Sequence, residues 1–322
     1  MSMRFLHIKR AYVVDPTYTF EVERDVASNI SLLNNVYSGE HVHDVCAISE
    51  EGEWLMHGRK IEPAVLLQLY STVFVYIHSP NESYDRAFHM CEAHAQKYVL
   101  IYKATDIVLH HAARLEALIK THALKVKFAH QIHLNMNEHN EDSIPSEVIA
   151  GKHIRSVFLP VHVISSSYRT QVPGMHTPKL AHDYDQLVSH LDNMRHSNSD
   201  LALRSHIEGD SVFVASLPNT RGEKIYASVP LSAKVIHGSA HFQTSHLPYA
   251  IKKEITTVVQ DVSKVLFPKT LVVYNLQVHP KRGVFIQSTS PFYYFILHNP
   301  DFLFELANTH GIEVAQLFES VL

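Results

Sequence analysis

The sequence predicts an α/β fold in which a doubly wound parallel sheet is followed by two further α+β units. Three observations lead to this prediction. Strand-like and helix-like segments alternate through the first third of the chain. One of these strands is continuously apolar, as strands of buried parallel sheets are. The length of 322 residues is too great for one ordinary core and sufficient for two or three units.

The first unit is predicted to span residues 1–104. Its expected elements are a strand over Arg4–Val14, a helix over Val22–Val36, a strand over His43–Ile48, a hairpin over 50–61, a short helix over 63–71 and the apolar strand over 72–79. Ligands of doubly wound sheets bind beyond the carboxyl ends of the strands. We therefore expect the turns after Val14 and Ile77 to hold a ligand.

Two smaller units are predicted to span residues 105–210 and 211–322. The expected elements of the second unit are helices over Asp106–Thr121 and His182–Met194 and strands over Val126–Leu134, Ser156–Ile164 and Leu201–Ile207. Those of the third are strands over Ser211–Leu217, Thr270–Val278 and Gly283–Gln287, a loop-rich stretch from Ala233 to Pro248, and helices over Tyr249–Leu266 and Pro300–His310.

Charge and composition exclude several classes of protein. The formal net charge of -4 is spread without long runs of one sign. The sequence therefore shows no cluster of positive charge that would bind nucleic acid or an anionic membrane. No apolar run approaches the roughly 18 residues that span a bilayer, and the first residues lack the apolar core of a signal peptide. Only two cysteines, Cys46 and Cys91, occur. We expect a cytoplasmic protein without nucleic acid or membrane partners.

Histidine is unusually frequent, with 26 residues, and glycine is scarce, with 10. Candidate metal ligands are the pairs His41 and His43, His110 and His111, and His130 and His133. The histidines are scattered, however, and neither a cysteine pair nor an HExxH string accompanies them, whereas a zinc site needs three or four converging ligands. The sequence therefore predicts no specific metal site, and a histidine-rich metal-binding protein is kept only as an alternative.

Strings at the beginning, middle and end of the chain resemble the D-alanine:D-alanine ligase family of the ATP-grasp superfamily. VERDVASNISLLNNV, over 22–36, is similar to the ERxVSLxS segment that opens the first helix of these ligases. VFVYIHSPNES, over 73–83, resembles their strand and loop VFPxLHGxxGEDG. Residues 283–322 follow the family pattern LExNTSPGM, a helix and then AGxxxxxLxxxIL.

The resemblance implies an ATP-grasp-like fold of three subdomains and a homodimer. It also implies ATP and Mg²⁺ as cofactors of a ligase that joins two D-alanines. The product of that reaction is a peptidoglycan precursor. Phosphoryl transfer depends on cations around the phosphates and on carboxylates that hold magnesium.

Most nucleotide positions implied by the resemblance carry other residue types. Arg114 stands at the position of the first phosphate lysine and Leu159 at that of the second. Arg204 and Ser211 stand where the family has two glutamates on the nucleotide side. Leu159 offers phosphate nothing, and Arg114 keeps the charge without the compact ammonium.

The implied magnesium positions are neutral as well. Asn275 stands at the aspartate position, and Ile286 and Ser288 stand at the positions of the last glutamate and asparagine. A shift of one residue would place Gln287 instead of Ile286, which is also neutral. No carboxylate remains at these positions to hold magnesium.

The substrate side retains three family residues. Glu23 matches the glutamate that receives the amino group of the first D-alanine, His78 matches the histidine of LHG, and Ser165 matches a serine that orients that glutamate. The loop that carries KY in the family reads His241 and Phe242, so the tyrosine hydroxyl is absent.

Three functions follow from these residues. The first is a pseudoenzyme with no catalytic residue set intact and no cofactor, kept for binding a small molecule, for assembly as a homodimer or with a protein partner, or for regulation. The second is an active ATP- and Mg²⁺-dependent ligase in which Arg114, Arg204, Lys152 or the histidines supply the missing cations. The third is the histidine-rich metal-binding protein.

Overall fold

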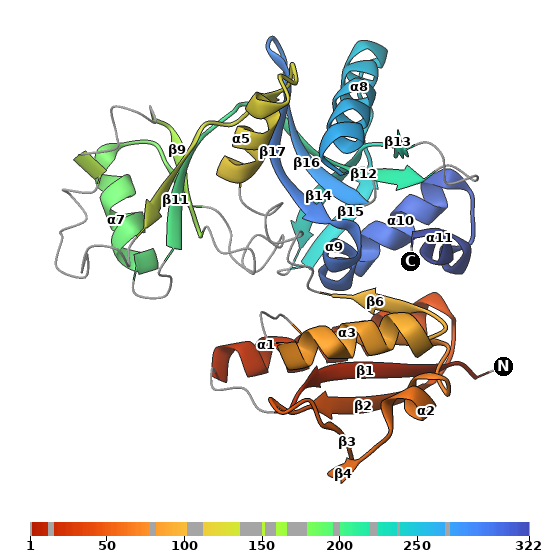
Figure 1. The fold of residues 1–322 in the computed structure, drawn as a ribbon. Coiled ribbons are helices and arrows are strands. Elements are labelled where there is room, and N and C mark those ends of the chain that lie inside the picture. Colours follow the sequence, from red (N-terminus) through yellow and green to blue (C-terminus); the bar gives the residue numbers. More distant parts are fainter. Residues whose placement is uncertain are drawn as a thin grey trace.

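A computed structural model describes residues 2–11, 16–77, 82–101, 112–135, 150–151, 159–165, 179–195, 200–218, 225–236, 239–267 and 271–321. The strands form three sheets. Figure 1 shows the first sheet in a lower lobe that contains the N-terminus, with the second and third sheets side by side above it.

The first sheet has the strand order β4-β3-β2-β1-β5-β6. Its strands are β1 (Arg4–Arg10), β2 (Val42–Ile48), β3 (Trp54–Met56), β4 (Arg59–Lys60), β5 (Thr72–Val75) and β6 (Tyr98–Leu100), and its helices are α1 (Pro16–Val36), α2 (Pro63–Leu67) and α3 (Glu82–His94). Strand β1 pairs in parallel with β2 and β5, and β5 pairs in parallel with β6. The hairpin β3–β4 extends the sheet in antiparallel fashion.

Alternate residues of β1 face opposite sides of this sheet. Phe5 packs with helix α1, whereas Leu6 and Ile8 pack in a separate core with α2 and α3. Because helices cover both faces, the sheet is doubly wound, as predicted. Helix α3 and strand β6 lie where the sequence analysis assigned no element. The turns expected to hold a ligand fall at 12–15 and 78–81, outside the described residues.

The second sheet is antiparallel and has the order β10-β9-β11-β8. Its strands are β8 (Gln131–Asn135), β9 (Val161–Ser165), β10 (Lys179–Ala181) and β11 (Asp200–Ser205). Helix α7 (Tyr184–Arg195) covers one face, where Leu187 and Leu191 pack with Val163 and Leu203. Alternation along β9 and β11 leaves His162 and Arg204 on the opposite face.

The third sheet has the order β15-β14-β12-β16-β17-β7, and β13 pairs with β12. Its strands are β7 (Lys127–Phe128), β12 (Asp210–Pro218), β13 (Ile225–Ala227), β14 (Leu231–Ile236), β15 (Ser239–Thr244), β16 (Val272–His279) and β17 (Gly283–Pro291). Helices α8 (Tyr249–Leu266) and α5 (Ala112–Thr121) cover one face through a core that includes Val259, Leu115 and Tyr274.

Two sequence-based expectations about this sheet are wrong. The stretch from Ala233 to Pro248, expected to be loop, contains most of the β14–β15 hairpin. The expected strand over Val126–Leu134 is divided, because β7 pairs with β17 of the third sheet while β8 belongs to the second. The chain crosses between the sheets at Ala129, which packs with Ile207 and Phe285. The domain boundaries at 104/105 and 210/211 stay predictions.

Three helices end the chain: α9 (Phe292–His298), α10 (Pro300–His310) and α11 (Val314–Val321). In Figure 1 they lie between the third sheet and the first lobe. One continuous core joins these parts, since Phe295 and Phe302 belong to the same cluster as Phe213 of the third sheet and Phe74 and Leu33 of the first unit. This packing fixes the third sheet relative to the first unit. Among the described helices, none has the length and apolarity needed to cross a membrane.

Candidate functional site

Polar side chains gather at one end of the third sheet, on the face opposite α8. Ser211 of β12 and Asn275 of β16 lie on neighbouring strands, and Oγ of Ser211 donates a hydrogen bond to Oδ1 of Asn275 at 3.0 Å. Asn275 is directly opposite Ser288 of β17, and residues opposite one another share a face. The structure therefore brings three of the predicted positions together, and all three are neutral.

Two glutamines extend this group. Gln277 Nε2 donates to the carbonyl oxygen of Gly209 at 2.5 Å, and Gln287 Nε2 donates to Gln277 Oε1 at 2.9 Å. Gln277 is not among the positions predicted from the sequence, although its spacing of two from Asn275 in a strand places both on one face. We call the set of Ser211, Asn275, Gln277, Gln287 and Ser288 the amide–hydroxyl face.

Ile286 lies on the other side of the sheet. Its side chain is 1% exposed and packs beneath α8 with Leu276. The pairing register shifts between Asn275 and Leu276, so that Leu276 opposes Ile286 while Asn275 opposes Ser288. Gln287 is the extra residue of this β-bulge. The structure thus places Gln287, the alternative shifted by one residue, on the amide–hydroxyl face and Ile286 in the core.

A second polar group lies on the face of the second sheet opposite α7. Gln131, Arg204 and His162 are side by side in register on β8, β11 and β9. Arg204 is 7% exposed, and its Nε donates to Oε1 of Gln131 at 3.1 Å. Within the described parts of the chain Arg204 forms no ion pair. Burial lowers the pKa of Arg204 to about 10, so the guanidinium still carries its charge at neutral pH.

Two histidines complete the second group. Nε2 of His162 and Nδ1 of His206 are 3.0 Å apart and share a hydrogen bond. Burial, followed by the repulsion of His206 and Arg204, lowers the pKa of His162 to about 4, so this imidazole is neutral at pH 7. Its Nδ1 is buried and has no hydrogen-bond partner in the described residues. We call Gln131, Arg204, His162 and His206 the arginine cluster.

Leu159 does not belong to the arginine cluster. It precedes β9 and packs with the core beneath α7. The positions of β9 that share the face of Arg204 are His162 and Ile164, because they alternate with Val161 and Val163 of the α7 core. The predicted second phosphate position is therefore apolar and lies on the side of the sheet away from Arg204.

Glu23 forms an ion pair with Lys9. The carboxylate lies on α1 and the ammonium on the adjacent strand β1, and both side chains are partly exposed. The carboxylate expected to receive an external amino group thus already has an internal cation beside it. This contact was not predicted from the sequence.

The remaining predicted positions are only partly described. His78 lies outside the described residues, and for Arg114 on α5 and Ser165 on β9 only the backbone is described. His241 Nδ1 lies 3.1 Å from Oδ2 of Asp301. Phe242 is buried against Phe302, with ring centroids 5.1 Å apart, so the residue at the position of the family's tyrosine is part of the aromatic core.

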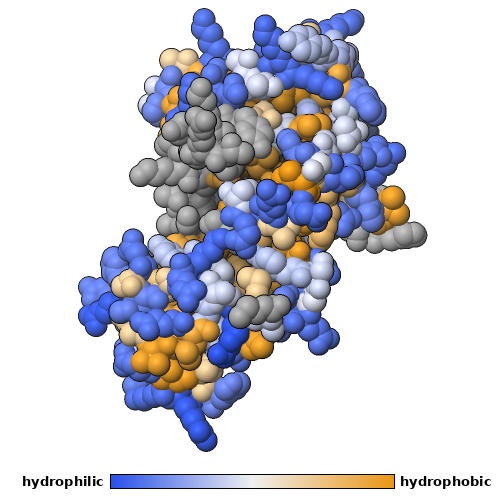
Figure 2. Space-filling model, turned by 90° about the vertical axis from the view of Figure 1, so that its right-hand side faces the viewer, coloured by the Kyte–Doolittle hydropathy of each residue, from blue (hydrophilic) through white to orange (hydrophobic). Residues whose placement is uncertain are grey.

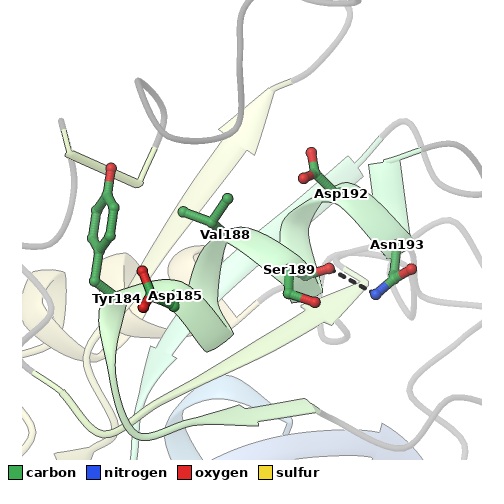
Figure 3. Close-up of a pocket in the computed structure, with 6 residues that line it drawn as sticks. All are labelled: Tyr184, Asp185, Val188, Ser189, Asp192 and Asn193. Atoms are coloured by element: carbon green, nitrogen blue, oxygen red, sulfur yellow. Dashed lines mark hydrogen bonds between the residues drawn. The ribbon is translucent and has the colours of Figure 1, made fainter.

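A pocket of about 500 Å³ lies on α7, as Figure 3 shows. Its described lining comes from α7 alone: Tyr184, Asp185, Val188, Ser189, Asp192 and Asn193. Tyr184 and Val188 also pack against the core that Leu187 and Leu191 form with the second sheet, so the pocket begins at the edge of that core and extends over the outer side of the helix. The pocket therefore contains none of the positions that the sequence selected.

Among the described residues, no group of three or more histidines, cysteines and carboxylates is placed to hold a metal ion. His41 and His43 instead pack against Phe5, with ring centroids 5.8 and 5.3 Å away.

No family model and no curated protein matches the sequence. Solved structures do match. A D-alanine–D-alanine ligase from Bacillus anthracis has a TM-score of 0.60 and 12% identity, and the match covers 100% of this chain and 96% of that one. For a D-alanine–D-alanine ligase from Coxiella burnetii the TM-score is 0.61, the identity 13% and the coverage 99% and 92%. The VanG D-Ala:D-Ser ligase from Enterococcus faecalis has a TM-score of 0.62 and 10% identity, and the match covers 100% of this chain and 98% of that one.

These matches extend over the whole chain, but their sequence identity is so low that they establish the fold alone. The protein therefore has the ATP-grasp-like fold of the D-alanine–D-alanine ligases, as its sequence predicted. The fold does not determine whether the ligase chemistry is retained, because function depends on the residues of the site.

Proposed function

We propose that this protein is a catalytically inactive homologue of the D-alanine–D-alanine ligases, with divergent and degenerate site motifs, that serves in binding, assembly or regulation. The observation that carries the proposal is the neutrality of the amide–hydroxyl face. Its side chains are amides and hydroxyls, and four of them, those of Ser211, Asn275, Gln277 and Gln287, already bond to one another or to the backbone. Magnesium is held by carboxylates in phosphoryl-transfer sites, and this face offers none.

The ion pair of Glu23 with Lys9 supports the same proposal from the substrate side. An ammonium group of a substrate would have to compete with Lys9 for the carboxylate. The two like charges would repel one another across a few ångströms. Recognition of D-alanine through Glu23 is therefore disfavoured, and a different ligand fits the proposal better.

Arg204 favours the second candidate, an active ligase with a remodelled site. A buried guanidinium can replace a lysine beside a phosphate group. In that case ATP and Mg²⁺ are cofactors, and the missing magnesium ligands come from residues outside the amide–hydroxyl face. The metal-binding alternative has no such support from the described residues.

We further propose a cytoplasmic homodimer. Figure 2 shows hydrophobic side chains gathered on the lower lobe, which holds the first unit. Val65 and Leu69, in and just beyond α2, are 61% and 53% exposed, so this unit presents apolar surface that a second copy could cover. Light scattering at micromolar concentration tests this, with a mass of twice 36.6 kDa expected and a monomer contradicting it.

Turnover separates the two leading candidates. The purified protein is incubated with ATP, Mg²⁺ and D-alanine, and ADP is measured beside the Bacillus anthracis ligase as the positive control. The pseudoenzyme proposal predicts no ADP above the protein-free background. D-alanine-dependent ADP release that stops when magnesium is chelated would overturn the proposal and establish the remodelled ligase.

A further inference from the structure

Arg204 is a buried cation that has no anionic partner among the described residues. Its one hydrogen bond to the described residues uses Nε and goes to the neutral amide of Gln131. Both Nη groups are left without a protein acceptor in that part of the chain. Burying an ion is costly unless an opposite charge and further hydrogen bonds compensate it. The folded protein thus holds a positive charge whose compensation the described residues do not supply.

The described neighbours of Arg204 on this face carry no negative charge. His162 and His206 lie next to it on the same face, and their ring nitrogens share one hydrogen bond 3.0 Å long. Nδ1 of His162 is buried and unpartnered among the described residues. Coulombic repulsion from Arg204 also acts on His162. Among the described residues, the arginine cluster therefore contains one unpaired cation and one buried ring nitrogen without a partner, and it contains no carboxylate.

From this geometry we infer that the arginine cluster binds an anionic oxygen group, a phosphate or a carboxylate, of a small molecule. The inference rests on the proposed binding role and names the class of ligand for it. The planar guanidinium presents its two Nη groups as a fork that fits two oxygens of one such group. Gln131 holds the fork in place through Nε.

The anionic group binds without a divalent cation. Residues 206–209 connect Arg204 on β11 to Ser211 on β12, so the arginine cluster and the amide–hydroxyl face lie at the two ends of one short connection. The amide–hydroxyl face provides neutral donors and acceptors but no ligand set for magnesium. A ligand that carries its charge at one end and uncharged polar groups elsewhere matches this pair of surfaces.

Calorimetric titration in a phosphate-free chloride buffer tests the inference. The full chain is titrated separately with inorganic phosphate and with succinate, both without divalent metal. We expect saturable binding of at least one of them at one site per chain, and the preferred compound identifies the source of the anionic oxygens. If neither compound binds the wild-type protein, the inference is wrong whatever the variants do.

Variants locate the binding. Arg204→Met is expected to weaken the affinity for the bound anion roughly tenfold or more, because a charge-assisted hydrogen bond pair is lost. Arg204→Lys is expected to retain part of the affinity. The matched control is Arg59→Met, at an exposed arginine of the first unit, which should bind as the wild type does. Unchanged affinity in a folded Arg204→Met variant would overturn the assignment.

Failure of the anion-binding inference can be distinguished from failure of the proposed function. ADP release in the turnover assay would contradict inactivity while leaving the anion site in place. An absence of phosphate and succinate binding would remove the anion site while leaving inactivity untouched. The folded state of each variant is checked by its circular dichroism spectrum and unfolding midpoint.

Discussion

The hydroxyl of Tyr293 donates a hydrogen bond of 2.6 Å to Oδ1 of Asn29. Tyr293 lies on α9 and Asn29 on α1, so the bond joins the end of the chain to the first unit. Nδ2 of the same asparagine donates to the hydroxyl of Tyr76 at 2.7 Å. Asn29 is fully buried, and both ends of its amide are satisfied by residues from different parts of the fold.

Removing the Tyr293 hydroxyl should weaken the attachment of the first unit. Tyr293→Phe leaves Oδ1 of Asn29 buried without this donor, which costs about 1–3 kcal/mol of unfolding free energy. Urea denaturation measures it. The control Tyr249→Phe alters a tyrosine that is 82% exposed and should leave the midpoint unchanged. Equal stability of Tyr293→Phe and wild type would show that the bond contributes nothing.

His7 should make the protein sensitive to acid. Its ring is fully buried, with Nδ1 3.0 Å from the Tyr76 hydroxyl and Nε2 3.1 Å from Nδ1 of His43. Burial, followed by repulsion from His43, lowers the pKa of His7 from 6.5 to about 3. Below pH 6.5 His7 is therefore protonated in the unfolded chain but stays neutral in the folded protein. The free energy of unfolding falls as the pH drops from 6.5 toward 3.

The size of this effect follows from the proton linkage. When the pH is lowered from 7 to 5, we expect the titration of His7 to reduce the free energy of unfolding by about 2 kcal/mol. Urea denaturation at a series of pH values measures it. His7→Gln, which cannot titrate, should be less stable than wild type at pH 7 but lose less stability on acidification. A variant with the wild-type pH dependence would contradict the role of His7.

Gly209 should not tolerate a side chain. Its φ is +124°, and a Cβ at this position would lie 1.9 Å from the carbonyl oxygen of Val278. Gly209→Ala is therefore expected to cost roughly 3 kcal/mol or more, from strain and from displacement of backbone. It should also disturb Gln277, which donates to the Gly209 carbonyl.

The control for that substitution is Gly58→Ala. Gly58 has a φ of +75° but no atom within 4 Å of an added Cβ, so only backbone strain of about 1 kcal/mol is expected. Unfolding midpoints in urea give both values. Equal losses for the two variants would show that the contact with Val278 does not matter.

The parts of the fold that the sequence predicts well have strong local signals. Helices α8 and α10 have the predicted bounds, because apolar residues recur at helical spacing and a proline stands at or just before each first turn. The β14–β15 hairpin escaped prediction although apolar and polar residues alternate in LSAKVI and SAHFQT, because alanine, which strands disfavour, holds one apolar position in each strand. Helix α9, with the sequence FYYFILH, is apolar all round, and such a run gives no period that separates a helix from a strand.

The candidate site was only partly predictable for a different reason. Ser211, Asn275 and Ser288 were selected from family motifs and do lie together. Because of the bulge at Gln287, this residue lies on the amide–hydroxyl face and Ile286 lies in the core beneath α8. The position of a bulge cannot be read from a single sequence. The arginine cluster depends on the pairing of β8, β9 and β11, whose residues are distant along the chain, so no local pattern joins Gln131 to Arg204.

Calorimetry of the purified protein with ATP, in the presence and absence of magnesium, measures directly whether magnesium-dependent nucleotide binding has been lost. If the amide–hydroxyl face holds no magnesium, ATP should show no binding that depends on the metal, so the two titrations should coincide and chelation should change nothing. Thermal unfolding should likewise show no magnesium-dependent gain, since a ligand stabilises a protein in proportion to its binding to the folded state. Tight, saturable ATP binding that requires magnesium and is abolished by chelation would contradict the account.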